Sequence, residues 1–173
     1  MSEAIGRIYC ADSSALIDLP KTYPADNFPG VWGKIGMLAD EGRLITVDLV
    51  KDECNDKELA EWFNDHSVVT ILPSTELEFS LKQIMRDLVS KSMQLVDVES
   101  KESDADPLII ACAMAGNLRE SGRYSSGRYV LLQHESSAWP SPKRVRIPDV
   151  CGWYGITYIR LTALIQEEGW VFP

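Results

Sequence analysis

The sequence predicts an α/β fold in which a mostly parallel central sheet lies between two layers of helices. Three observations lead to this prediction. Five short apolar segments have the length and composition of buried strands, helical segments separate them, and no internal repeat or low-complexity tract interrupts the alternation. The 173 residues fit one domain, residues 1–173, with a sizeable core.

Apolar periodicity and chain breakers set the expected element boundaries. In chain order, we expect a strand at 7–10, a helix at 13–19, a helix at 31–41, a strand at 44–47, a helix at 49–64, a strand at 68–72, a helix at 75–93, a helix at 107–117, a strand at 129–132, a helical turn at 149–153, a strand at 156–159 and a helix at 161–168.

The strands in the first half of the chain are apolar and rich in β-branched residues, and its helices repeat apolar side chains every three or four positions. Pro20 is expected to stop the first helix, because proline fits poorly inside a helix. Gly42 is expected to end the second helix, since glycine readily takes the left-handed conformation of a helix end.

In the second half, helix ends are predicted from capping patterns. Thr75 with Glu78 is typical of a capping box at a helix start. Asp106 is expected to be the N-cap of the next helix, and Pro107 its first helical residue. The helix that follows is apolar on all sides, which is typical of a buried helix. Residues 116–127, rich in Gly, Ser and Arg, are expected to form a loop.

The chain is acidic, with 26 Asp and Glu against 17 Lys and Arg, a net charge of −9 and a pI of about 4.7. This balance argues against a protein that coats nucleic acid broadly, because such proteins need surplus cations. It leaves open an enzyme that gathers carboxylates around a metal. No apolar run reaches the roughly 18 residues that a membrane span needs, so no membrane partner is expected.

The N-terminal residues have no signal-peptide pattern, and the four cysteines have no metal-binding spacing. We therefore expect a cytoplasmic protein with small buried thiols in a reducing compartment.

Acidic residues follow the predicted strands at the sheet edge where α/β proteins place their sites. Asp12 follows the first strand, Asp48 the second and Glu135 the fourth. Two of them have an ordinary alternative role: Asp12 can cap a helix, and Glu135 can be a surface residue. Two or more carboxylates converging on one point would suit Mg²⁺ or Mn²⁺, because hard cations prefer oxygen ligands. Sequence spacing alone does not establish such convergence.

Several segments resemble PIN-domain nucleases, in the order that family has them. YCADSSAL at 9–16 resembles the opening motif, DPLIIACA at 106–113 the third motif and LLQHE at 131–135 the fourth. Glu53 matches the acidic residue of the helix after the second strand. Three further segments resemble a longer PIN-like branch allied to the VapC-type toxins: 29–32, 59–62 and 147–151.

The resemblance implies a three-layer α/β/α fold and Mg²⁺- or Mn²⁺-dependent hydrolysis of RNA. It makes the following residues the catalytic and metal-site candidates: Asp12, Glu53, Asp106 and Glu135. Supporting candidates are Ser13, Ser14, Asp104 and His134. The chain departs from the family pattern in two places: Gln133 and His134 stand where a Thr usually precedes the last acid, and Ser14 stands where Asn is frequent.

The same resemblance implies a toxin of a toxin–antitoxin pair, with an antitoxin protein as partner and a homodimer as its assembly. Four basic residues are candidate RNA contacts, although each also suits a solvated loop: Arg123, Arg128, Lys143 and Arg144. Two alternatives stay open. A haloacid-dehalogenase-like phosphatase also has an Asp after its first strand, and a PIN-like module without activity would bind but not cleave.

Overall fold

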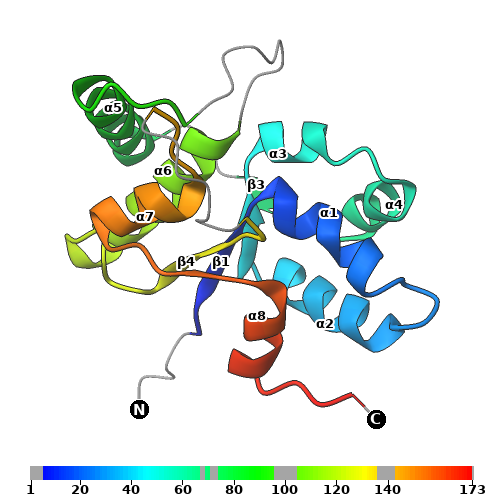
Figure 1. The fold of residues 1–173 in the computed structure, drawn as a ribbon. Helices are drawn as coiled ribbons and strands as arrows, with labels where there is room; N and C mark the ends of the chain where they lie inside the picture. Colours follow the sequence, from blue (N-terminus) through cyan, green and yellow to red (C-terminus); the bar gives the residue numbers. More distant parts are fainter. Residues whose placement is uncertain (1–5, 67–68, 71–73, 96–104, 136–142, 173) are drawn as a thin grey trace, which may run out of the picture.

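A five-stranded sheet lies at the centre of the computed structural model (Figure 1). The structure describes residues 6–66, 69–70, 74–95, 105–135 and 143–172. The strand order is β3-β2-β1-β4-β5, and all four pairings between neighbouring strands are parallel. The strands are β1 (Ile8–Ala11), β2 (Leu44–Thr46), β3 (Val69–Thr70), β4 (Tyr129–Leu132) and β5 (Tyr158–Ile159).

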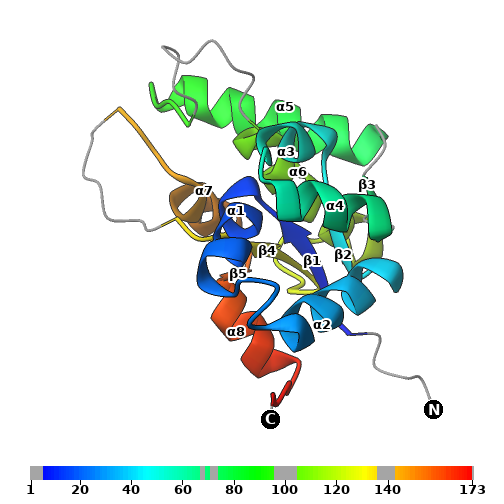
Figure 2. The same ribbon diagram turned by 90° about the vertical axis from the view of Figure 1, so that its right-hand side faces the viewer.

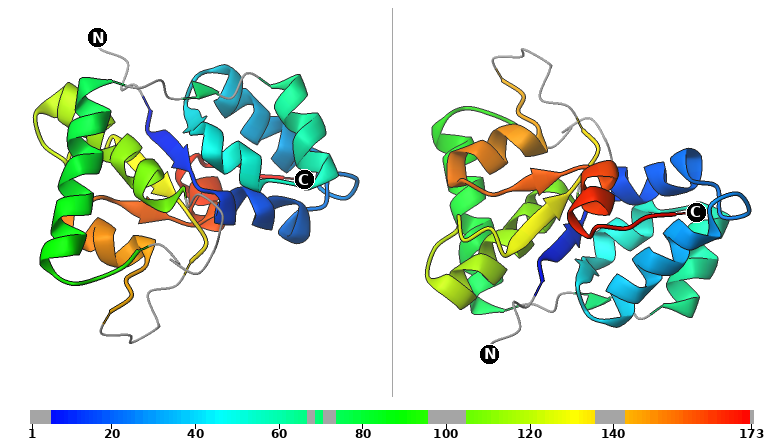
Figure 3. Two further views of the ribbon diagram at one scale, coloured as in Figure 1. Left: turned by 90° about the horizontal axis from the view of Figure 1, so that it is seen from above. Right: turned by 90° about the horizontal axis from the view of Figure 1, so that it is seen from below.

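Helices cover both faces of the sheet, so the expected three-layer α/β/α architecture is confirmed (Figures 1 and 2). The helices are α1 (Ser13–Thr22), α2 (Pro29–Asp40), α3 (Asp48–Glu53), α4 (Lys57–Asp65), α5 (Thr75–Ser90), α6 (Asp106–Ser121), α7 (Ile147–Tyr154) and α8 (Leu161–Glu167). Helix α6 packs on β1 and β4, with α5 and α7 against it. Helices α1, α2 and α4 lie on the other side, and the view along the sheet separates the two groups (Figure 3).

The central strands β1 and β4 are buried at nearly every position. Ile8 pairs with Tyr129 and Ala11 with Leu132, which brings the carboxyl ends of both strands to the same level. The Thr46 hydroxyl donates a buried hydrogen bond of 2.7 Å to the Ala11 carbonyl, so the end of β2 is fixed beside the end of β1. This carboxyl edge of the sheet is where α1, α3 and α6 begin.

Helix α6 is buried along most of its length, as its apolar sequence predicts. It continues to Ser121, past the expected end, and Gly122 ends it with a φ of +68°. Gly116 lies inside this helix, at a point where a Cβ atom would clash with the Tyr129 ring. The absence of a side chain at Gly116 therefore allows α6 and β4 to pack closely. The loop expected at 116–127 begins only after Ser121, where the helix ends.

Three further helix boundaries differ from the prediction. Pro20 lies inside α1, which runs on to Thr22, so this proline does not stop the helix. The single helix expected at 49–64 is two, α3 and α4, because the Asp56 side chain accepts hydrogen bonds from Glu58 N and Leu59 N and starts a new helix. The cap of α5 is Ser74, which accepts from Leu77 N at 3.1 Å.

All four cysteines are buried and free, as expected. Among the described residues, no helix has the length and apolar character to cross a membrane.

Candidate active site

Asp12 lies between the end of β1 and the start of α1, and it is 1 % exposed. Its Oδ2 atom accepts hydrogen bonds from Ser14 N at 3.1 Å and from Ser14 Oγ at 2.6 Å. Asp12 is therefore the N-cap of α1, the alternative that the sequence left open. Capping uses one carboxylate oxygen and fixes the side chain at the carboxyl edge, so it is compatible with a site.

Ser14 connects the ends of the two central strands. Its hydroxyl donates to Asp12 and accepts a hydrogen bond of 3.0 Å from the main-chain N–H of His134. Ser14 stands where PIN-domain nucleases frequently have Asn. Its hydroxyl orients Asp12 and holds the main chain just after β4. These two hydrogen bonds fix the Asp12 carboxylate relative to the end of β4.

Glu53 is the last residue of α3 and reaches the beginning of α6. Its Oε1 atom accepts a hydrogen bond of 3.3 Å from the main-chain N–H of Ala105. Asp106 follows as the first residue of α6, and Ala105, not Asp106, is the N-cap. The expected cap assignment for Asp106 is therefore wrong, and its carboxylate lies in the first turn, where the helix dipole favours negative charge.

Cys54 shows that Asp12 and Glu53 share one neighbourhood. Burial, together with the negative charges of Glu53, Asp12 and Asp56, raises the pKa of the Cys54 thiol to about 12. The end of α3 and the end of β1 are thus close enough for their carboxylates to act on the same group. Asp12, Glu53, Asp106 and Glu135 all stand at the carboxyl edge of the sheet, and we call these four residues the acidic edge.

The acidic edge can hold a divalent cation only if its oxygen ligands meet at one point. In the described part of the chain, no group of three or more His, Cys, Asp or Glu side chains is arranged to hold a metal ion. Asp104, the remaining acidic candidate, lies outside the described residues.

A buried oxygen supports the fit of a cation here. Gln133, the residue after β4, is 1 % exposed, and its Oε1 atom has no hydrogen-bond partner in the part of the chain that the structure describes. Buried amide oxygens almost always have a partner, and an amide oxygen is a suitable ligand for a hard cation. Sequence reasoning noted Gln133 only as a departure from the family pattern and did not make it a site residue.

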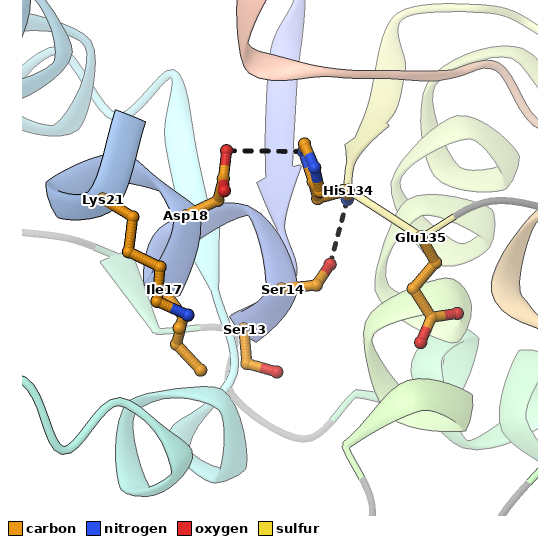
Figure 4. Close-up of a pocket in the computed structure, with 7 residues that line it drawn as sticks. All are labelled: Ser13, Ser14, Ile17, Asp18, Lys21, His134 and Glu135. Carbon is orange, nitrogen blue, oxygen red and sulfur yellow. Dashed lines mark hydrogen bonds and ion pairs between the residues drawn. The ribbon is translucent and has the colours of Figure 1, made fainter. Parts of the chain in front are cut away.

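A pocket of about 420 Å³ adjoins the acidic edge on the side of α1 (Figure 4). We call it the α1 pocket; its lining residues are Ser13, Ser14, Ile17, Asp18, Lys21, His134 and Glu135. Asp18 and His134 point toward one another across it, with 3.4 Å between Oδ2 and Nδ1, while Glu135 points away from His134 (Figure 4). Lys21 brings a cation to this surface.

Asp18 and Lys21 were missed at the sequence level, although one signal could have found them. Ser14, Asp18 and Lys21 recur at intervals of four and three residues, so they share a helix face that begins at the candidate site.

The four expected RNA contacts lie in two places. Arg123 and Arg128 precede β4 at the amino end of the sheet, opposite the acidic edge, and Arg128 forms a 2.7 Å ion pair with Glu120. The structure does not bring this pair to the acids. Lys143 and Arg144 precede α7 and are exposed.

Comparison with known families identifies the chain. Residues 9–172 match the model of the family DUF4411, described as a domain of unknown function. The match spans most of the chain, which therefore belongs to this family. The comparison with curated proteins gave no match.

Proposed function

We propose that this member of the DUF4411 family is a Mg²⁺- or Mn²⁺-dependent endoribonuclease that hydrolyses RNA phosphodiester bonds. The observation that supports the proposal best is the position of the acidic edge. Four acidic residues from separate parts of the chain stand at the carboxyl edge of a parallel sheet, and one of them, Asp12, is 1 % exposed. Burying or gathering carboxylates is costly, and hydrogen bonds or a bound cation reduce that cost.

The proposed roles follow from the contacts of each residue. Asp12, fixed by Ser14, and Asp106, in the first turn of α6, would hold the cation. Glu53 and Glu135 are half-buried and would orient a water and accept its proton as it attacks phosphorus. A bound divalent cation would neutralise phosphate charge and lower the pKa of a bound water.

The α1 pocket would receive the nucleotide next to the bond that is cleaved. Its volume of about 420 Å³ lies in the range of small-ligand sites. Lys21 would attract a phosphate, and the imidazole of His134, held by Asp18, would face the sugar or base. The net charge of −9 favours this short contact over extended binding along an RNA strand.

The resemblance to VapC-type toxins adds a biological setting to the proposal. We place the enzyme in the cytoplasm as the toxin of a toxin–antitoxin pair, as a homodimer inhibited by an antitoxin. An antitoxin with a basic segment would suit the acidic edge, because opposite charges favour association.

The test is cleavage of a mixed single-stranded RNA by the purified chain with Mn²⁺, with Mg²⁺ and with excess chelator. Asp12→Asn and Asp106→Asn should abolish cleavage, and Asp12→Asn should stay folded because Asn caps helices as well as Asp. The matched control is Asp65→Asn, an exposed Asp at the end of α4, which should cleave at the wild-type rate.

Four results would overturn the proposal. Full activity of both site variants would show that these acids are not needed for catalysis. Full activity in excess chelator would show that the reaction needs no cation. Metal-dependent release of phosphate from a small ester, without RNA cleavage, would favour the phosphatase. Neither cleavage nor Mn²⁺ binding would favour a binding module.

A further inference from the structure

The side-chain amide oxygen of Gln133 is buried. Its main-chain N–H donates to the Ile159 carbonyl at 3.0 Å and so continues the pairing between β4 and β5. Its side chain is 1 % exposed, and among the described residues Oε1 has no hydrogen-bond partner. A buried oxygen in this state is unfavourable for a folded chain, so a compensating group is expected.

Two contacts show which face of the sheet Gln133 occupies. The Tyr129 ring packs against Gly116 of α6, and Cys10 Sγ lies 3.9 Å from Cys112 Sγ of the same helix. Side chains alternate along a strand, and Cys10 pairs with Leu131. Two residues further on, Asp12 and Gln133 therefore lie on the α6 face.

Helix α6 runs antiparallel to these strands, so its start lies at their ends. Two strand residues span about 7 Å, which corresponds to about four or five helix residues. Counting back from Cys112 by that amount reaches the first turn of α6, which Asp106 begins. Gln133, Asp12 and Asp106 thus occupy one level on one face of the sheet.

We propose that Gln133 Oε1 is an oxygen ligand of the divalent cation, completing the ligand set of Asp12 and Asp106; this inference rests on the proposed function. An amide oxygen binds Mg²⁺ or Mn²⁺ as a hard neutral donor. It adds a ligand without adding a negative charge, which suits an edge that already holds four acids. The amide then gains on metal binding the partner that it lacks without metal.

The experiment measures Mn²⁺ binding to the full chain by calorimetry and by the electron paramagnetic resonance of free Mn²⁺. Gln133→Met keeps the volume and removes the oxygen, and Gln133→Glu keeps an oxygen at the same position. The control is Gln166→Met, an exposed glutamine on α8. We expect Gln133→Met to weaken Mn²⁺ binding by about 10- to 100-fold, and Gln133→Glu and the control to retain it.

Stability without metal is the second measurement, because a merely structural glutamine would behave differently. Removing an unsatisfied oxygen should raise the melting temperature of metal-free Gln133→Met by about 2 to 4 °C. A fall in that temperature, or Mn²⁺ binding within twofold of wild type, would overturn the inference while leaving the proposed function intact. Absence of Mn²⁺ binding by the wild-type chain would overturn both.

Discussion

Asn117 should be the most costly polar side chain to truncate in this protein. It is fully buried in α6 and forms four hydrogen bonds to the segment that leads into β4. Its Nδ2 donates to the Tyr124 carbonyl at 2.9 Å and to the Tyr129 carbonyl at 3.0 Å. Its Oδ1 accepts from Tyr129 N at 2.8 Å and from the Ser126 hydroxyl at 2.5 Å.

The magnitude follows from these four bonds. A hydrogen bond contributes about 1 kcal/mol net, and a buried group left without its partner costs about 1 to 3 kcal/mol. Asn117→Ala leaves both main-chain groups of Tyr129 without this partner and opens a small cavity. We therefore expect the free energy of unfolding to fall by about 3 to 5 kcal/mol. For a chain of 173 residues this corresponds to a melting temperature lower by about 6 to 20 °C.

Thermal and urea unfolding followed by circular dichroism would measure the effect. Ser126→Ala removes one of the four bonds and should cost about 1 kcal/mol. Asn64→Ala, at an exposed position of α4, is the matched control and should change stability by less than about 0.5 kcal/mol. A loss below about 1 kcal/mol in Asn117→Ala would show that this network does not anchor the start of β4.

Two other predictions concern the ends and the centre of the fold. Burial alone would raise the pKa of Glu168, but hydrogen bonds from Arg43 and Tyr9 lower it, so Glu168→Gln should cost about 1 to 2 kcal/mol in urea unfolding at pH 7. Because the native pKa lies below the unfolded value of about 4.3, this difference should be complete above that value and shrink as the pH falls through the native pKa; an equal difference at pH 3 would contradict it. Gly116→Ala should lower stability by about 1 to 3 kcal/mol, since its Cβ would meet the Tyr129 ring. Gly33→Ala, with open space in α2, is the control and should be neutral or stabilising, and equal effects in both variants would contradict the packing role.

The sequence predicts the layers and strands well because period and composition decide them locally. All five predicted strands are present, and their alternation with helices gives the observed parallel sheet. The apolar 107–117 segment predicts a buried helix, since no polar face is available for solvent.

Helix ends are predicted less well because tertiary contacts decide them. Gly116 is expected in a loop, but it lies in α6, where its lack of a side chain leaves room for the Tyr129 ring. Pro20 lies two residues before the end of α1, so the one main-chain hydrogen bond that it cannot donate is lost in the last turn and little helix follows it. Asp56 interrupts an apolar period that continues on both sides, so periodicity alone joins α3 and α4.

The acidic edge shows the same division between local and tertiary information. The sequence identifies acids after strands, but only the fold brings Glu53 to the start of α6 and Ser14 to the main chain of His134. It also separates Arg123 from this edge, because the loop that holds Arg123 enters β4 at its other end. Lys21 lines the pocket because it shares a face of α1 with Ser14, a spacing that the sequence contains but that gains meaning only once the site is located.

The charge of the chain gives the Gln133 inference a physical reason. Each added carboxylate at the acidic edge strengthens cation binding but also increases repulsion in the metal-free chain. A neutral amide in place of another acid reduces this repulsion and keeps a hard oxygen. Gln133→Glu should therefore bind Mn²⁺ at least as tightly as wild type but unfold more easily without metal, because a buried carboxylate would then stand on the same face as Asp12. Greater metal-free stability of Gln133→Glu would show that no negative charge lies nearby, and would separate Gln133 from the acidic edge.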